Sequence, residues 1–225
     1  MALTDHNLVA TPPIRPIGKA VAAPGSRSAP RRCGFTLVEL LVTIAVISSL
    51  LAILAPSLVQ VRTLANRTVC LSNTRGIALA TQMYVGKNDS FPPAWQGDTC
   101  RWMDLVKPYA DKTSSVYRCP ADTQQITCTW DSEIVLSYGI NTFRFTDNAH
   151  CFWYAVGAYA VQRPMETILF ADCTPGYYYC GGGKAFREPV TYVDYRHRDG
   201  FNAVYCDGHA KWRKATTKRD WDASQ

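Results

Sequence analysis

The sequence lacks the patterns that mark most catalytic and metal-binding sites. It contains no C-x-x-C pair, and its four histidines are not spaced like zinc ligands. It has no G-x-S-x-G or comparable nucleophile motif and no D-x-D-x-D-G calcium loop. We therefore expect a protein that is not an enzyme, with no catalytic residue, no metal site and no cofactor. Calcium stays open as a cofactor, because three aspartates could donate oxygens to it: Asp172, Asp194 and Asp199.

The chain has little net charge outside the first 34 residues. The formal net charge is +6. Five basic residues and one acidic residue in residues 1–34 account for +4, which leaves +2 for the chain from residue 35 onward. That is too little to make an electrostatic surface for nucleic acid, so we expect no nucleic-acid partner. The charged residues of this segment are Asp5, Arg15, Lys19, Arg27, Arg31 and Arg32.

The cysteines divide in the same way as the charge. Of the nine, Cys33 lies in the basic segment and eight follow it. An even number of cysteines in an exported domain is typical of disulfides, while a zinc site or free thiols are the competing interpretations. Spacing alone leaves the connectivity open. The disulfide candidates are Cys70, Cys100, Cys119, Cys128, Cys151, Cys173, Cys180 and Cys206.

A long apolar run begins abruptly after residue 34. Residues 1–34 are rich in Pro, Ala, Ser and Arg, and such a segment is expected to be disordered. The 21 residues from Phe35 to Ala55 carry one charge, Glu39. As a helix they would be about 30 Å long, enough to cross the hydrocarbon core of a bilayer. A secretory signal peptide, a lipoprotein signal and a twin-arginine signal were the alternatives, and none of them explains Glu39.

The apolar run is predicted to continue into an amphipathic helix. Pro56 removes one backbone hydrogen bond and is expected to kink or locally melt one turn. Beyond it, apolar residues recur at helical spacing among polar ones. The pattern predicts one helix over residues 36–85, with a transmembrane part at 35–56 and an amphipathic part at 57–86. Residues 86–89 (Gly-Lys-Asn-Asp) are expected to end it.

Residues 87–225 have the character of a head domain built from short strands and loops. Asp199-Gly200 and Asp207-Gly208 are hairpin dipeptides, so residues 190–213 are predicted to form a three-stranded antiparallel meander. The expected fold class is α+β, with a long N-terminal helix packed on a small antiparallel sheet. The strand candidates are 134–138, 153–161, 167–171, 190–195, 201–206 and 210–213.

Glu39 lies within the first turns of the apolar run, where a carboxylate is costly unless it finds a partner. Cutting the chain after Gly34 would create a positive α-amino group on Phe35. In a bundle of such helices, Glu39 of one subunit could pair with that amine on a neighbour. The alternative is an acid that reaches the membrane interface on its own.

These residues resemble the signature of type IV pilin-like prepilins. In that signature a basic leader ends in Gly, the first mature residue is Phe and the fifth is Glu, as at Gly34, Phe35 and Glu39. Pro56 occupies the place where these pilins commonly carry a kinking proline. The resemblance implies cleavage by a prepilin peptidase after Gly34 and N-methylation of Phe35. It also implies a single-pass inner-membrane protein with a periplasmic or extracellular head. An assembly platform would build it into a pilus or a type II secretion pseudopilus.

A second resemblance concerns the C-terminal part. His197, Asp207 and Gly208 match the H-X9-DG pattern of a prepilin-associated domain. The segments around Asn73, 117–122 and 137–141 are similar to that family as well. His197 and Asp207 could instead form a catalytic dyad or two ligands of a metal. However, the meander would separate the two residues by roughly 16 Å along the strands. We therefore expect Asp207-Gly208 to be a structural turn and His197 to contact local backbone.

The predicted function is structural, as a subunit of a pilus-like filament or of a secretion pseudopilus. The expected partners are other such subunits, the prepilin peptidase, the assembly platform and membrane lipid. The alternative is a membrane-tethered protein that binds sugar or metal and does not polymerise. Aromatic residues at 152–154 and 177–179 could form a sugar-binding surface, although aromatics in a strand-rich domain are usually core or cross-strand pairs.

Overall fold

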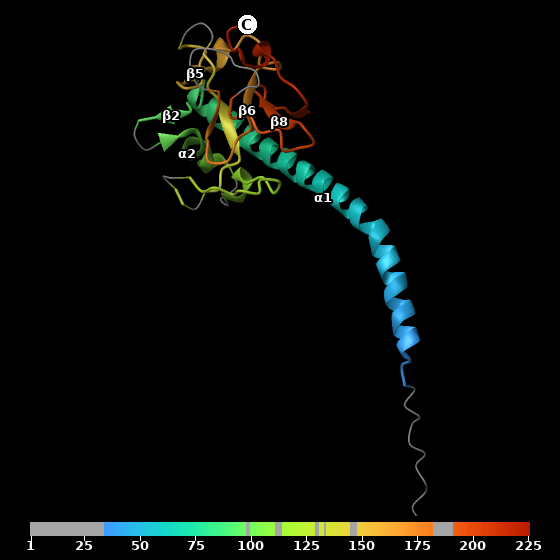
Figure 1. Ribbon diagram of the computed structural model, residues 1–225. Helices are drawn as coiled ribbons and strands as arrows, with labels where there is room; N and C mark the ends of the chain where they lie inside the picture. Colours follow the sequence, from blue (N-terminus) through green and yellow to red (C-terminus); the bar gives the residue numbers. More distant parts are fainter. Residues whose placement is uncertain are drawn as a thin grey trace, which may run out of the picture. The chain divides into compact units, whose positions relative to one another are not determined.

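The computed structural model describes residues 34–97, 100–110, 114–128, 131–132, 134–144, 148–181 and 191–225. The predicted disorder of the leader falls on residues outside these ranges, apart from Gly34. The chain divides into two compact units, residues 1–48 and 49–225. The strands and most of the other elements belong to the second unit (Figure 1).

The first element is a single helix, α1, from Leu37 to Asn88. Its bounds lie close to the predicted ones. The helix is continuous through Pro56, which lies within it. It passes Gly86 and ends at Asn88, because Asp89 takes a left-handed backbone conformation with φ 54°. The amide of Asp89 still donates to the carbonyl of Val85 at 2.8 Å, which satisfies one of the last carbonyls of the helix.

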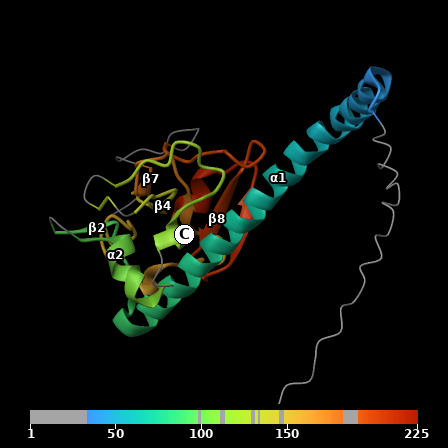
Figure 2. The same cartoon turned by 90° about the horizontal axis from the view of Figure 1, so that it is seen from below.

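The two parts of α1 differ in burial, but the buried part begins at Cys70, later than the predicted start of the amphipathic part at residue 57. No residue of the helix before Cys70 is buried, and its large apolar side chains there are exposed. From Cys70 onward one face is buried with the spacing of a helical stripe, at Cys70, Thr74, Ile77, Ala78, Ala80 and Thr81. This part of α1 contributes to the head's main core and lies beside the sheet (Figure 2).

The central sheet of the head has five strands in the order β7-β4-β6-β8-β9. Every residue of β4, β6 and β8 is buried. All neighbouring pairs are antiparallel except β4 and β7, which are parallel. The strands are β4 (Tyr138–Asn141), β6 (Ile168–Asp172), β7 (Tyr179–Cys180), β8 (Phe201–Tyr205) and β9 (Ala210–Arg213).

Shorter elements surround this sheet. Two small antiparallel pairs form, β1 (Ser90–Phe91) with β5 (Val156–Gly157) and β2 (Trp95–Gln96) with β3 (Cys100–Arg101). A short helix, α2, follows β3. The helical elements are α2 (Trp102–Val106), η1 (Lys107–Tyr109), η2 (Ser114–Tyr117), η3 (Ala158–Ala160) and η4 (Lys218–Trp221).

Three of the predicted strands are confirmed within one residue, namely β6, β8 and β9. The candidate at 134–138 is displaced, since β4 begins at its last residue. The candidate at 153–161 is reduced to the two residues of β5, followed by η3. The strand at 190–195 is wrong for its described residues, because Tyr192 has φ 67° and only Val193 makes a bridge, to Cys173. The three-stranded meander is therefore a two-stranded hairpin, β8-β9, with β6 on its other side.

The two predicted turns also differ in detail. The first turn is formed by Arg198 and Asp199, both left-handed with φ 54° and 57°, and not by Asp199-Gly200. Its ends are His197 and Gly200, where the His197 amide donates to the Gly200 carbonyl at 2.9 Å. The second turn lies between β8 and β9 and contains Asp207-Gly208, with Gly208 at φ 92°.

Candidate functional site

The predicted processing site lies just outside the helix. Gly34, Phe35 and Thr36 have no regular secondary structure, and α1 begins at Leu37. Phe35 is 71% exposed, and a Cβ added to Gly34 would meet no atom within 4 Å. The bond between Gly34 and Phe35 therefore lies in irregular backbone, and no atom of the described residues lies close enough to require glycine at residue 34.

Glu39 closes a capping box at the start of α1. The backbone amide of Thr36 donates to Oε2 of Glu39 at 2.9 Å, and the Thr36 hydroxyl donates to the same oxygen at 2.7 Å. In return the Glu39 amide donates to Oγ1 of Thr36 at 3.2 Å. These contacts satisfy amides that the first turn of a helix leaves unpaired. The sequence analysis missed this role, although the T-x-x-E spacing signals it.

The carboxylate of Glu39 also borders an apolar surface. Phe35, Val38, Glu39, Val42 and Thr43 together line a shallow open pocket on α1. All the lining residues lie within the first compact unit. A charged group thus lies beside exposed apolar side chains, an arrangement that suits contact with an apolar helix carrying one positive charge.

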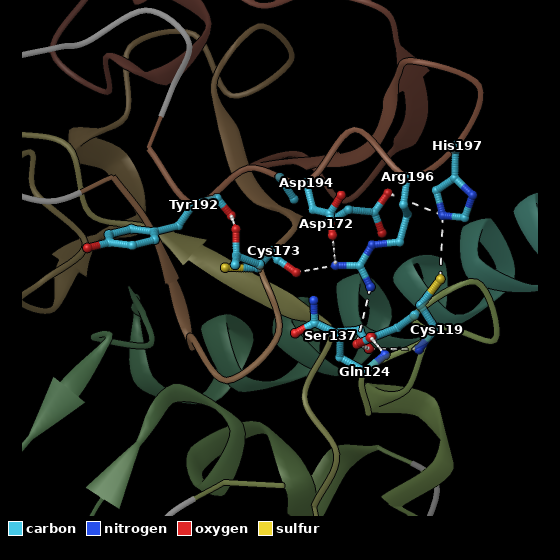
Figure 3. Close-up of polar contacts among 12 residues, drawn as sticks. Cys119, Gln124, Ser137, Asp172, Cys173, Tyr192, Asp194, Arg196 and His197 are labelled. Atoms are coloured by element: carbon cyan, nitrogen blue, oxygen red, sulfur yellow. Dashed lines mark hydrogen bonds and ion pairs between the residues drawn. The ribbon is translucent and has the colours of Figure 1, made fainter. Parts of the chain in front are cut away.

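His197 lies in the head and is buried, with 1% of its surface exposed. Its Nε2 atom is 3.4 Å from Sγ of Cys119 and 3.5 Å from Oδ2 of Asp172 (Figure 3). The His197 amide contacts local backbone as expected, by donating to the Gly200 carbonyl, but its side chain reaches Cys119 and Asp172. The tight turn lies at residues 198–199, one residue earlier than expected, and the His197 side chain enters the core. Asp172, the last residue of β6, is the partner that the sequence analysis did not identify.

Burial holds Asp172 and His197 uncharged over a wide pH range. Burial raises the pKa of Asp172 to about 7, against the opposing effect of Arg196 and of a hydrogen bond from the Asn202 amide. Burial lowers the pKa of His197 to about 4, and the positive charge of Arg196 acts in the same direction. Between these values the carboxyl is protonated and the imidazole is neutral. The 3.5 Å contact between them then joins two uncharged groups and is not an ion pair.

Arg196 joins the same region to a second set of carboxylates. Its guanidinium lies 3.3 Å from Asp122 and 3.0 Å from Asp194, and it donates to the carbonyl of Cys173. Asp122 also accepts a hydrogen bond from the Ser137 hydroxyl at 2.7 Å. Figure 3 shows the Arg196 side chain lying among Asp194, Cys173 and Ser137, which come from separate segments. This network fastens the segment after residue 191 to the sheet and to the loop before β4.

Asp207 takes no part in this network. It lies in the turn before β9, and its Oδ1 is 2.6 Å from Nδ1 of His209. Gly208 occupies the left-handed position of that turn, which glycine adopts without strain. The first and last members of the H-X9-DG pattern therefore have different surroundings: His197 is buried among polar core groups, while Asp207 and Gly208 shape a turn.

One of the expected disulfides is present. Cys70 of α1 is bonded to Cys119, and the bond joins the helix to the loop after η2. The expectation that all eight cysteines pair is met by this pair only, since the structure leaves the other six as free thiols. These are Cys100, Cys128, Cys151, Cys173, Cys180 and Cys206.

Two sets of residues contain groups that could bind a metal. Ligand atoms of Cys70, Cys119 and His197 lie within 4.8 Å of one another. The disulfide commits both sulfurs, so they are not thiolate ligands in this state. The aspartates considered for calcium do not form a cluster of three ligand atoms, because Asp194 pairs with the Arg196 guanidinium and Asp172 with His197.

The aromatic segments divide between core and surface. Phe152 is buried and packs edge-on against Phe91 at 5.5 Å, as expected of a core residue. Other rings form a continuous series of contacts at the partly exposed surface of the head, including one stacked pair with centroids 4.0 Å apart. The series runs through Trp95, Trp153, Tyr179, Tyr192 and Tyr177.

Comparisons with known proteins identify the N-terminal segment. The family described as the prokaryotic N-terminal methylation motif matches residues 29–55. No curated protein and no solved structure matches the chain. The matched segment includes Gly34, Phe35 and Glu39, and α1 is the one helix in the described part of the chain that is long and apolar enough to cross a membrane. The chain thus carries a prepilin-type methylation motif followed by a long apolar helix and a small sheet domain, and this layout supports a type IV pilin-like protein.

Proposed function

We propose that this chain is the precursor of a filament subunit. A prepilin peptidase cuts it after Gly34, and the new amine of Phe35 is methylated. The observation that carries the proposal is the position of the methylation motif, which coincides with irregular backbone at residues 34–36 and with the start of an exposed apolar helix. A peptidase needs an accessible, non-helical bond, and this segment offers one.

The apolar part of α1 has two successive environments in this proposal. It first anchors the subunit in the inner membrane as a single span, with the head on the periplasmic or extracellular side. It then packs among the helices of neighbouring subunits, where an assembly platform adds each subunit to a pilus or to a type II secretion pseudopilus. Glu39 pairs with the Phe35 amine of a neighbour, which compensates its charge in an apolar bundle.

A second candidate function is a tethered receptor that does not polymerise. The partly exposed series of aromatic rings on the head favours sugar as its ligand, since such rings present both apolar faces and polar edges. Both functions keep the membrane anchor. They differ in whether Glu39 is needed for activity.

The experiment that tests processing is expression of the full chain in cells with a prepilin peptidase and in the same cells without it. We expect the mature protein from the first cells to begin at Phe35 and to carry one added methyl group, as read by N-terminal sequencing and intact mass. Retention of residue 1 in both cells would contradict the proposal.

Gly34→Ala sharpens this experiment. A Cβ at residue 34 would meet no atom of the described residues within 4 Å, so the variant should insert into the membrane with an unchanged head. We expect cleavage to be lost, because the requirement for glycine lies in the fit to the peptidase. Gly157→Ala is the matched control, since a Cβ there also meets nothing within 4 Å and lies far from the cut in sequence.

A further inference from the structure

Cys173 and Cys180 lie at the ends of two strands that flank the same neighbour. Cys173 directly follows β6, and Cys180 is the last residue of β7. Both strands pair with β4, on opposite sides. Both cysteines are completely buried. Only six residues separate them in the sequence, so the chain returns to the sheet within a short loop.

The two sulfur atoms lie around Gly139 in the middle of β4. Sγ of Cys173 is 2.8 Å from the point where a Cβ on Gly139 would be, so the missing side chain leaves the room that this sulfur fills. Sγ of Cys180 lies 3.7 Å from the carbonyl oxygen of the same glycine. The Cys173 thiol also donates to the carbonyl oxygen of Tyr179, the residue before Cys180, at 3.2 Å. The Gly139 site therefore brings together two sulfurs from different strands.

We propose that Cys173 and Cys180 form a second disulfide of the head. The bonded pair Cys70–Cys119 shows that the head is compatible with an oxidised state. Disulfides persist in oxidising compartments, where two neighbouring thiols in the same domain would meet the same oxidants. The other four free cysteines have no such partner thiol among the contacts of the described residues.

The bond forms by exchange with an external disulfide, either a protein dithiol oxidant or glutathione disulfide. The thiolate of one cysteine attacks the oxidant, which gives a mixed disulfide and releases one thiolate. The second cysteine then attacks the protein sulfur of that mixed disulfide and releases the second thiolate. Overall, two thiols lose two protons and two electrons, and the oxidant is reduced to two thiols.

Thiol–disulfide exchange with the oxidant must take place before these two sulfurs are completely buried. Burial raises the pKa of Cys180 well above its ordinary value, so the folded domain holds little of the reactive thiolate. The bond is therefore made while the sheet assembles. Once made, it closes the loop that carries Tyr177, Tyr178 and Tyr179, and it fixes the two-residue edge strand β7 to the end of β6 across β4.

The test uses full-length protein extracted from membranes without reductant. Free thiols are alkylated in denaturant, the protein is digested and the peptides are identified by mass spectrometry. We expect a linked peptide pair containing Cys173 and Cys180, with neither residue alkylated, and alkylated Cys128 and Cys206. Alkylation of both Cys173 and Cys180, or linkage of either one to a different cysteine, would overturn the proposal.

Single variants give a readout that does not depend on stability. Cys173→Ser should free the thiol of Cys180, and Cys180→Ser should free that of Cys173, so that labelling of the remaining partner rises from near zero to about one per chain. Cys128→Ser is the matched control, a buried cysteine whose loss should leave the Cys173–Cys180 peptide linked. If either partner stays unlabelled without the other, the pairing is wrong.

Discussion

Asp172 and His197 influence the pH dependence of stability in opposite directions. The folded pKa of Asp172 is raised to about 7 from 3.8, so between these values the folded state binds a proton that the unfolded chain does not. The folded pKa of His197 is lowered to about 4 from 6.5, so there the unfolded chain binds the extra proton. Each shift corresponds to a free energy on the order of 3–4 kcal/mol. Between about pH 4 and 6.5 the folded and the unfolded state each hold one proton on this pair, so the two contributions to the pH dependence of stability cancel.

Removing one partner should expose the effect of the other. In Asp172→Asn the lowered pKa of His197 remains, so the free energy of unfolding should rise as pH increases from about 4 to 6.5. In His197→Asn the raised pKa of Asp172 remains, so the free energy of unfolding should fall as pH increases from about 4 to 7. Denaturant unfolding at a series of pH values measures both slopes. Asp199→Asn, in the exposed turn, is the control, and parallel slopes in all three variants would refute the explanation.

Glu39 has two candidate partners, and they can be separated by substitution. Thr36→Val removes the hydroxyl of the capping box, which should cost about 1 kcal/mol at the helix end and leave the carboxylate free to pair with an amine. Glu39→Gln keeps a side chain of the same shape but removes the charge. We expect filament incorporation to be lost in Glu39→Gln and retained in Thr36→Val.

The measurement for these two variants is the fraction of subunit recovered in sheared filaments or in assembled pseudopili. N-terminal sequencing must first show that both variants are processed equally. Equal loss in the two variants would mean that the cap, and not the charge, is what assembly needs.

The residues of the N-terminal motif could be located from the sequence because their signal is linear. Gly34, Phe35 and Glu39 are recognised by spacing within a few residues. The polar core of the head could not be found in this way. Arg196 and His197 stand in a run of charged and polar residues that suggests a solvated surface, and their partners Asp122 and Asp172 are distant in the sequence.

At the scale of elements, prediction succeeded where local pattern decides the structure. The helix was found because its apolar and amphipathic periodicities extend over fifty residues. Strands β6, β8 and β9 were found because turn dipeptides or buried runs mark them. Strand β4 was displaced and β7 was missed, because β7 is defined by its pairing with β4 and not by an apolar pattern of its own.

The hairpin β8-β9 offers a test of the role of Gly208. Gly208 has a φ of 92°, which is costly for any residue with a Cβ. A Cβ added at residue 208 would lie 3.1 Å from Cγ of Gln82. We expect Gly208→Ala to reduce the free energy of unfolding by about 1–3 kcal/mol. Gly157→Ala has open space and an ordinary backbone conformation, and it should be close to neutral. Thermal and denaturant unfolding of both variants decides the point, and equal effects would contradict it.

At the scale of the whole molecule, folding and membrane anchoring are assigned to different parts of one helix. The buried core begins at Cys70, and no residue of α1 before it is buried. A chain that begins at Asn66 should therefore fold, retain the Cys70–Cys119 bond and remain monomeric without detergent, whereas the full chain should require detergent or lipid. Size-exclusion chromatography, circular dichroism and non-reducing mass spectrometry test this. Aggregation or loss of the bond in the shorter chain would show that the apolar half supports the head.

The continuity of α1 has a consequence for how variants of this protein are screened. A melting experiment reports on side chains that lose contacts when the head unfolds, and residues 37–69 of α1 have no buried member. Changes there should leave the melting temperature almost constant while still abolishing the cellular phenotype. Substitutions in the head should lower the melting temperature and leave the cellular phenotype intact, until the head no longer folds. Sorting variants by whether the two readouts agree would locate the functional boundary within the helix without any further structure.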